Sequence, residues 1–150
     1  GVDGLNPTDL VTDAVERLNS QEDFHSEHEI YCYVRLFRSA PENWSARIQP
    51  KLEEAVQELI QANPEEWGNY VPKPLDFVRK PNHERFGIDR DLLEKNLNFL
   101  VENLEENGVI EPTWEWGQYE EEWDRAKQEW TGILTLEGLI TLNQFDRIDF

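Results

Sequence analysis

The segment IDRDLLEKNLNFLVENLEENG, residues 88–108, restricts the fold of this chain more than any other stretch. Five of its apolar residues recur at helical intervals, which places them on one face of a helix. This stripe consists of Leu93, Leu97, Leu100, Val101 and Leu104. Asp89 is suited to cap the first turn, and Asn107-Gly108 is a typical stop signal. We therefore predict a long amphipathic helix here.

Two earlier segments also favour helices. Asn6, Pro7 and Asp9 form a good helix start, because they supply a cap, a first-turn proline and a favourable charge. The run IYCYVRLF, residues 30–37, has the β-branched and aromatic composition of a strand. The spacing of its apolar residues instead favours the continuation of a helix from Glu27.

The middle of the chain contains several proline signals. Ser39 and Glu42 have the spacing of a capping box, and Pro50 is expected to break or restart the following helix. Residues 68–87 carry three prolines and two glycines, which is typical of an irregular connection. We predict a single domain, residues 1–150. It can be subdivided into a helical segment, residues 1–67, this connection, residues 68–87, and a C-terminal segment, residues 88–150.

The remaining segments add a small β element to the expected fold. VIEPTWEW, residues 109–116, reads as a short strand, and QYEEEWDRAKQEW, residues 118–130, has its aromatic residues at helical spacing. Residues 133–145 fit either a hairpin that turns at Glu137-Gly138 or a strand followed by a helix. The predicted class is mainly α with a small β element (α+β), with a helical N-terminal half.

The charge balance limits the possible partners. The chain has 32 acidic and 14 basic residues, a net charge of −18 at pH 7. Such a surface repels the phosphates of nucleic acids and of anionic membranes. It attracts cations, basic protein surfaces and proteins that themselves bind DNA. The simpler alternative is that the charge only maintains solubility or reflects a salty cytoplasm.

The single cysteine indicates the compartment. Cys32 cannot form an intrachain disulfide, which favours a reducing cytoplasm. We expect its side chain to be buried, since it lies within an apolar run. The chain shows neither a signal-peptide pattern nor an apolar run of the roughly 20 residues that a membrane span needs. A cytoplasmic protein is expected.

The second half resembles a known family. The phrases FLVENLEENGVIE and GILTLEGLITL, within residues 88–145, are similar to the C-terminal region of winged helix-turn-helix domains. The resemblance implies a winged-helix-like C-terminal half in which residues 88–107 are the groove-reading helix. That helix carries six carboxylates against Arg90 and Lys95, whereas groove readers need basic or amide side chains. The resemblance therefore implies a protein-interaction module without direct nucleic-acid binding.

Catalytic and metal-binding patterns are weak. His25 and His28 lie three residues apart and are the best candidates for metal ligands, but a structural site needs four. Cys32 as a nucleophile, or His83 with its acidic neighbours, are the only candidates for catalysis. No cofactor motif is present. We predict a non-enzymatic protein without a metal or cofactor.

The acidic aromatic stretch that follows residue 110 is the best candidate site. We expect Tyr119, Trp123 and Trp130 to face the core, and the two tryptophans of WEW to share one strand face. Large rings among charges are typical of interface hot spots. The predicted partner-binding residues are Glu111, Trp114, Glu115, Trp116, Glu120, Glu121, Glu122 and Asp124.

Three functional hypotheses follow from these observations. The leading one is an acidic adaptor that binds a basic protein surface. The second is a DNA-mimic inhibitor that occupies the DNA channel of a nucleic-acid-binding complex. The third is a winged-helix transcription regulator, which would bind DNA directly. Oligomeric state is open.

Overall fold

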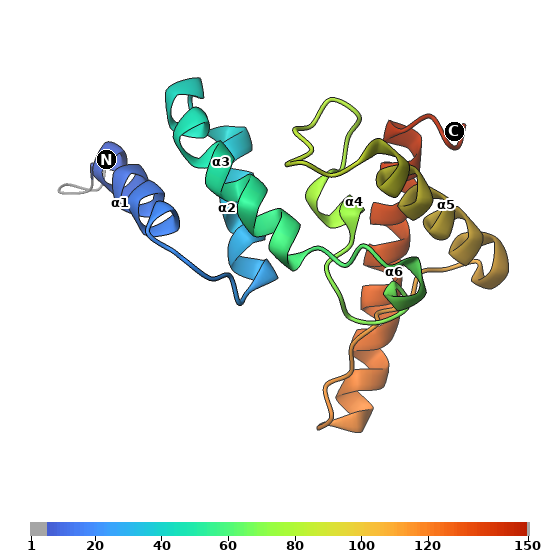
Figure 1. Ribbon diagram of the computed structural model, residues 1–150. Coiled ribbons are helices and arrows are strands. Elements are labelled where there is room, and N and C mark those ends of the chain that lie inside the picture. The colour runs from blue at the N-terminus through green and yellow to red at the C-terminus, as the bar shows by residue number, and fades with distance from the viewer. Residues whose placement is uncertain (1–5, 150) are drawn as a thin grey trace. The chain divides into compact units, whose positions relative to one another are not determined.

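The computed structural model describes residues 6–149, which form helices joined by loops (Figure 1). The helices are α1 (Pro7–Asn19), α2 (Glu27–Ser39), α3 (Glu42–Leu59), the 3-10 turn η1 (Pro64–Glu66), α4 (Pro74–Phe77), α5 (Arg90–Asn107) and α6 (Glu120–Gln144). None of the described residues is in a β-strand.

The absence of strands from residues 6–149 overturns four predictions. The α+β class is wrong, and so is the winged-helix resemblance, because a wing is a β-hairpin. Residues 109–116, expected as a strand, lie in the loop between α5 and α6. Residues 133–145 are neither a hairpin nor a strand and a helix, since α6 continues through Gly138 to Gln144. The chain is therefore described as all-α.

The chain forms two compact units, one up to Ile60 and the other from Gln61. In the first unit, α1 and α2 both pack against α3. The fully buried residues recur at helical spacing on each helix, as an amphipathic bundle requires. They are Val15, Leu18, Ile30, Val34, Ile48, Leu52, Ala55 and Val56. This core holds the first unit together.

Local sequence signals in the first unit predict some features correctly and others wrongly. The predicted start of α1 is confirmed, since the Asn6 side chain accepts a hydrogen bond from the amide of Thr8. The helical interpretation of residues 30–37 is also confirmed. Cys32 is exposed, so its expected burial is wrong. Pro50 neither breaks nor restarts α3, which contains it, and α3 begins after Pro41 without a capping box from Ser39.

The core of the second unit is built from α4, α5, the end of α6 and loop residues. Its largest buried side chains are Trp67, Phe77, Phe86, Leu97 and Leu142. The Trp67 ring donates a hydrogen bond to the carbonyl of Gln61 at 2.7 Å. Buried Asn96 on α5 accepts one from the amide of Leu75 at 2.9 Å. The irregular residues 68–87 thus supply some of this core, although they contain few helical residues.

Helix α5 confirms the prediction made from its apolar stripe. It ends at Asn107, and Gly108 follows in the left-handed conformation with φ of 72°. Asp89 stands at the N-cap position but makes no capping hydrogen bond from its side chain. A glycine is favoured at the position after a helix because a Cβ there is strained at positive φ. The chain then turns into the loop that precedes α6.

Candidate functional site

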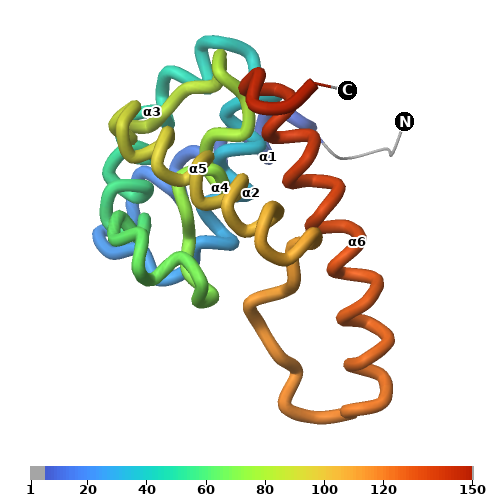
Figure 2. The backbone as a smooth tube through the Cα atoms, turned by 90° about the vertical axis from the view of Figure 1, so that its right-hand side faces the viewer, coloured from blue at the N-terminus to red at the C-terminus, as the bar shows by residue number. Residues whose placement is uncertain are grey.

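The loop between α5 and α6 runs back along the first half of α6 (Figure 2). Three contacts establish this antiparallel course, because they join successive loop residues to helix positions in reverse order. Ile110 donates its amide hydrogen to the Thr135 hydroxyl at 2.9 Å, Trp114 contacts Trp130, and Trp116 contacts Trp123. We call residues 109–131, this loop with the first half of α6, the arm.

Four tryptophans hold the arm together. Trp114 lies between Tyr70 and Trp130, with ring centroids 5.8 and 5.6 Å away, both in edge-to-face geometry. Trp116 packs on Trp123 at 5.4 Å. Aromatic pairs of this kind contribute about 0.5–1.5 kcal/mol each beyond the area they bury. The two rings of WEW thus pack on different residues of α6, so that each tryptophan of this motif has its own partner in the helix.

The arm leaves large aromatic surface in solvent. Trp116 is 48% exposed, Tyr119 69% and Trp130 39%. The expectation that Tyr119 and Trp130 face the core is therefore wrong, whereas Trp123 and Trp114 are half-buried. The reason is that the helical face which carries these rings packs on a single loop, and one loop covers less surface than a second helix does. Exposed tryptophan and tyrosine are enriched at protein interfaces.

Tyr119 has an unusual backbone conformation. It occupies the N-cap position of α6 with φ of 58° and ψ of 61°, and its side chain makes no capping hydrogen bond. A left-handed conformation is unfavourable for a residue with a bulky side chain, and Asn, Asp or Gly are the usual occupants. Strained residues of this kind cluster at functional sites. The position therefore holds an exposed ring where a smaller residue would stabilise the helix better.

The arm is strongly acidic, and its two cations are already paired. It has seven carboxylates against Arg125 and Lys127. Lys127 contacts Glu111 at 2.9 Å, and Arg125 contacts Glu129 at 3.3 Å. The five other carboxylates are exposed and have no ion pair among the residues the structure describes: Glu115, Glu120, Glu121, Glu122 and Asp124. Their negative charge is uncompensated within the arm.

All eight predicted binding residues lie in the arm, but their roles differ. Glu111 is a structural residue, since its ion pair with Lys127 ties the loop to α6. Trp114 is also structural, because it is half-buried between two rings. Trp116 and the five unpaired carboxylates remain accessible. Sequence reasoning missed Tyr119 as a surface residue, and no sequence signal indicated its left-handed backbone.

The histidines and the cysteine lie elsewhere. His25 is exposed before α2, and His28 is in the first turn of α2, where its ring stacks edge-on against Tyr31. His83 is half-buried in the loop between α4 and α5. Among residues 6–149, no three His, Cys, Asp or Glu side chains come together as a possible metal site.

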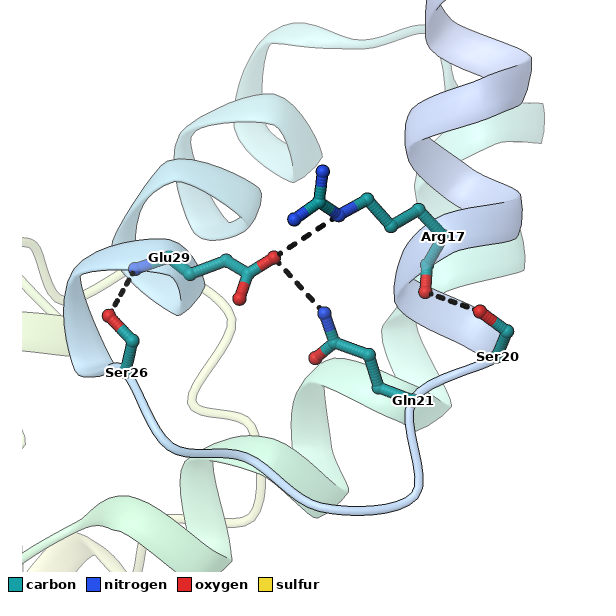
Figure 3. A network of polar contacts seen from close by, with 5 residues as sticks. All are labelled: Arg17, Ser20, Gln21, Ser26 and Glu29. Carbon is teal, nitrogen blue, oxygen red and sulfur yellow. Dashed lines mark hydrogen bonds and ion pairs between the residues drawn. The ribbon is translucent and has the colours of Figure 1, made fainter.

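A shallow groove of about 590 Å³ lies between α1 and α2 and is lined by Cys32 and Tyr33 among others. At one end of the interhelical space Glu29 contacts Arg17 at 3.7 Å and accepts a hydrogen bond from Gln21 at 3.0 Å (Figure 3). Burial, and secondarily the charge of Glu29, raises the pKa of Tyr33, while Arg17 opposes this shift. These contacts join α1 to α2 and have no catalytic geometry.

Comparison with protein-family models, with curated proteins and with solved structures found no match for this chain. In the described region of the chain, no helix combines the length and the apolar character needed to cross a lipid bilayer. The chemistry of the arm is therefore the main basis for a functional conclusion.

Proposed function

We propose that this chain is a non-enzymatic interaction module of a reducing, cytoplasmic environment, and that its arm binds a basic surface of a partner protein. One observation carries the proposal. Two exposed rings, Trp116 and Tyr119, stand beside five carboxylates that no basic side chain of the arm neutralises. Rings of this kind supply apolar contact area, and the charges select a partner of opposite sign.

The alternative that the charge only maintains solubility accounts less well for Tyr119. A solubilising role accounts for the carboxylates, but it does not account for a large ring at a strained, exposed helix start. A residue with a strained backbone and a ring that is 69% exposed is better explained by binding. The exposed and strained Tyr119 therefore favours an interface in the arm over a merely solvated face.

A DNA-mimic inhibitor is a narrower form of the same proposal. It is favoured by the three consecutive exposed glutamates, Glu120, Glu121 and Glu122, in the first turn of α6. In this form the basic surface of the partner would be its DNA-binding channel. Competition between this chain and duplex DNA for the isolated partner separates the mimic from an ordinary adaptor.

The experiment first isolates a partner protein that binds the immobilised wild-type chain. Calorimetry then compares the affinity of this partner for the wild-type chain and for two variants of the arm. The first variant is Trp116→Ala, and the second replaces Glu120, Glu121 and Glu122 with Gln. A matched control replaces Glu102, Glu105 and Glu106 on α5 with Gln. These three glutamates are also exposed, and their replacement removes the same number of negative charges. We expect both arm variants to weaken binding at least about tenfold, and the control to weaken it much less.

Salt provides a second criterion. Affinity for a basic partner should fall as ionic strength rises from about 0.05 to 0.5 M, because screening weakens the attraction. The glutamine variant of the arm should show a smaller salt dependence than the wild type. Equal affinity of wild type and both arm variants would refute the assignment of the site.

A further inference from the structure

One face of α6 carries an apolar stripe that is about half exposed. Ile133, Leu136 and Ile140 are 46%, 60% and 48% exposed. The residues of α6 that are buried, Gly138, Thr141 and Leu142, belong to the opposite side of the helix, since each residue advances by about 100°. Two faces of one helix are therefore apolar, and only one contributes to the core. We call Ile133, Leu136 and Ile140 the outer stripe.

The spacing of the outer stripe is that of a helix-docking seam. Its members stand at i, i+3 and i+7, which is the a–d–a pattern by which one helix packs along another. Isolated exposed aliphatic residues are ordinary, but three in register on one face are typical of a binding surface. A strand or a loop would not match a seam with this period.

The charge around the outer stripe indicates what kind of helix fits it. One turn and three turns before Ile133 on the same face are Glu129, which is ion-paired with Arg125, and Glu122, which has no ion pair among the described residues. Over its whole length α6 has six carboxylates and only Arg125 and Lys127 as cations, both paired within the arm. A second copy of this chain would bring the same negative charges together, which is repulsive. A helix with lysine or arginine at one end would be attracted.

We propose that the outer stripe of α6 is the docking site for an amphipathic helix of a partner protein, one whose apolar face carries lysine or arginine at one end. The apolar face covers Ile133, Leu136 and Ile140, and the basic end lies over Glu122, which has no ion pair among the described residues. This proposal deepens the proposed function, because it rests on a basic partner. It adds a second contact surface, distinct from the rings of Trp116 and Tyr119.

The test uses a synthetic helical peptide of about 21 residues, three heptads, with leucine at the a and d positions and lysines in one half. Two control peptides are compared with it. The first has the same composition, but its leucines are distributed over all faces of the helix. The second keeps the leucines at the a and d positions and has glutamate in place of every lysine. Binding is measured by calorimetry with the whole chain. We expect the designed peptide to bind more tightly than both controls, at least about tenfold.

The protein variants locate the site. The triple variant Ile133→Gln, Leu136→Gln and Ile140→Gln should lose at least about tenfold in affinity for the designed peptide. Leu10→Gln, which changes an equally exposed leucine on α1, is the matched control and should bind as the wild type does. Circular dichroism and the unfolding midpoint check that the triple variant folds, which is expected since these side chains are largely exposed.

Several results would overturn the inference. Unchanged peptide binding by the triple variant would exclude the stripe as the site. If the Trp116→Ala and glutamate variants lose peptide binding while the triple variant does not, the proposed function stands and only this inference fails. If the triple variant loses binding and the glutamine variant of the arm does not, the stripe binds the apolar face, but the placement of the basic end over Glu122 and the proposed role of the arm both fail. Self-association at high salt that the triple variant abolishes would identify a second copy as the occupant.

Discussion

The core of the second unit and the arm use the same side chains in opposite ways. Trp67 in the core is 1% exposed, and its ring nitrogen is bonded to a backbone carbonyl. Trp116 in the arm is 48% exposed and packs on one other ring. The Trp67 ring is removed from water and its one polar group is hydrogen-bonded, whereas about half of the Trp116 ring stays in water. The contrast separates residues that stabilise the fold from residues that are available to a partner.

The comparison also applies to charge. The core of the second unit contains one fully buried polar side chain on α5, Asn96, and this residue holds α4 through a hydrogen bond. The arm contains five carboxylates without a basic partner. Unpaired surface charge contributes little to the stability of a fold, so the charge of the arm does not hold the structure together, whereas the core does. Substitutions that act on one region and spare the other test this division.

The largest effect is expected for tryptophan truncation in the two regions. Trp67→Ala should destabilise the protein by about 3–5 kcal/mol, since it leaves a cavity in the core. Trp116→Ala should cost less than about 1.5 kcal/mol, because it removes one half-exposed aromatic pair. Urea unfolding followed by circular dichroism measures both. Similar losses from the two variants would contradict the distinction between core and arm.

A smaller effect is expected where the arm joins the core. A Cβ at Gly138 would lie 2.3 Å from Cδ1 of Ile110, so Gly138→Ala forces that side chain to move. Overpacking of this kind costs about 1–3 kcal/mol, which exceeds the gain of about 1 kcal/mol that alanine brings to a helix interior. Urea unfolding of the single variants and of the double variant with Ile110→Ala forms a double-mutant cycle. Additive effects would show that the two residues are not in contact.

Tyr119 should separate stability from binding. Tyr119→Asn is expected to raise the free energy of unfolding by up to about 1 kcal/mol, because asparagine tolerates the left-handed conformation. The same variant should weaken partner binding, since it removes the most exposed ring of the arm. Tyr119→Phe, which keeps the ring and the strain, is the control. A loss of stability in the asparagine variant would mean that the ring supports the fold.

The smallest effects are expected at alkaline pH and have opposite signs in the two units. Burial raises the pKa of Tyr33 above its ordinary value of 10.0, so its contribution to stability is complete below pH 10.0 and is lost as the pH rises through the folded pKa. Burial lowers the pKa of Lys73 from 10.5, despite the opposing charge of Asp76. The unfolded chain then holds the proton more tightly, and stability rises with pH up to about 10.5.

Thermal unfolding between about pH 9 and pH 11 measures these two contributions against the wild type. Tyr33→Phe should show a smaller loss of stability with rising pH than the wild type. Lys73→Met should show a larger loss, because it removes the opposing gain. Identical pH profiles for all three proteins would show that neither group is perturbed by the fold.

Predictions from the sequence are reliable where neighbouring residues decide the structure. The start of α1 at Asn6 and Pro7, the helical state of residues 30–37 and the end of α5 at Gly108 depend on caps, periodicity and backbone preference within a few residues. They fail where distant residues decide. Gly138 has the composition of a turn, but it lies within α6 and admits the Ile110 side chain. Cys32 lies in an apolar run, yet it is exposed on α2 and borders the groove between α1 and α2.

The sequence by itself determined that this chain is helical over most of its length, strongly acidic and rich in aromatic residues near position 120, because periodicity, charge and composition are local properties. Only the tertiary structure decided which of those rings are buried. WEW has the alternation of a strand, but no second strand pairs with it among the described residues. Its rings instead pack on Trp123 and Trp130 of α6. Burial depends on which surfaces meet, and the spacing of residues along one segment does not specify its partner.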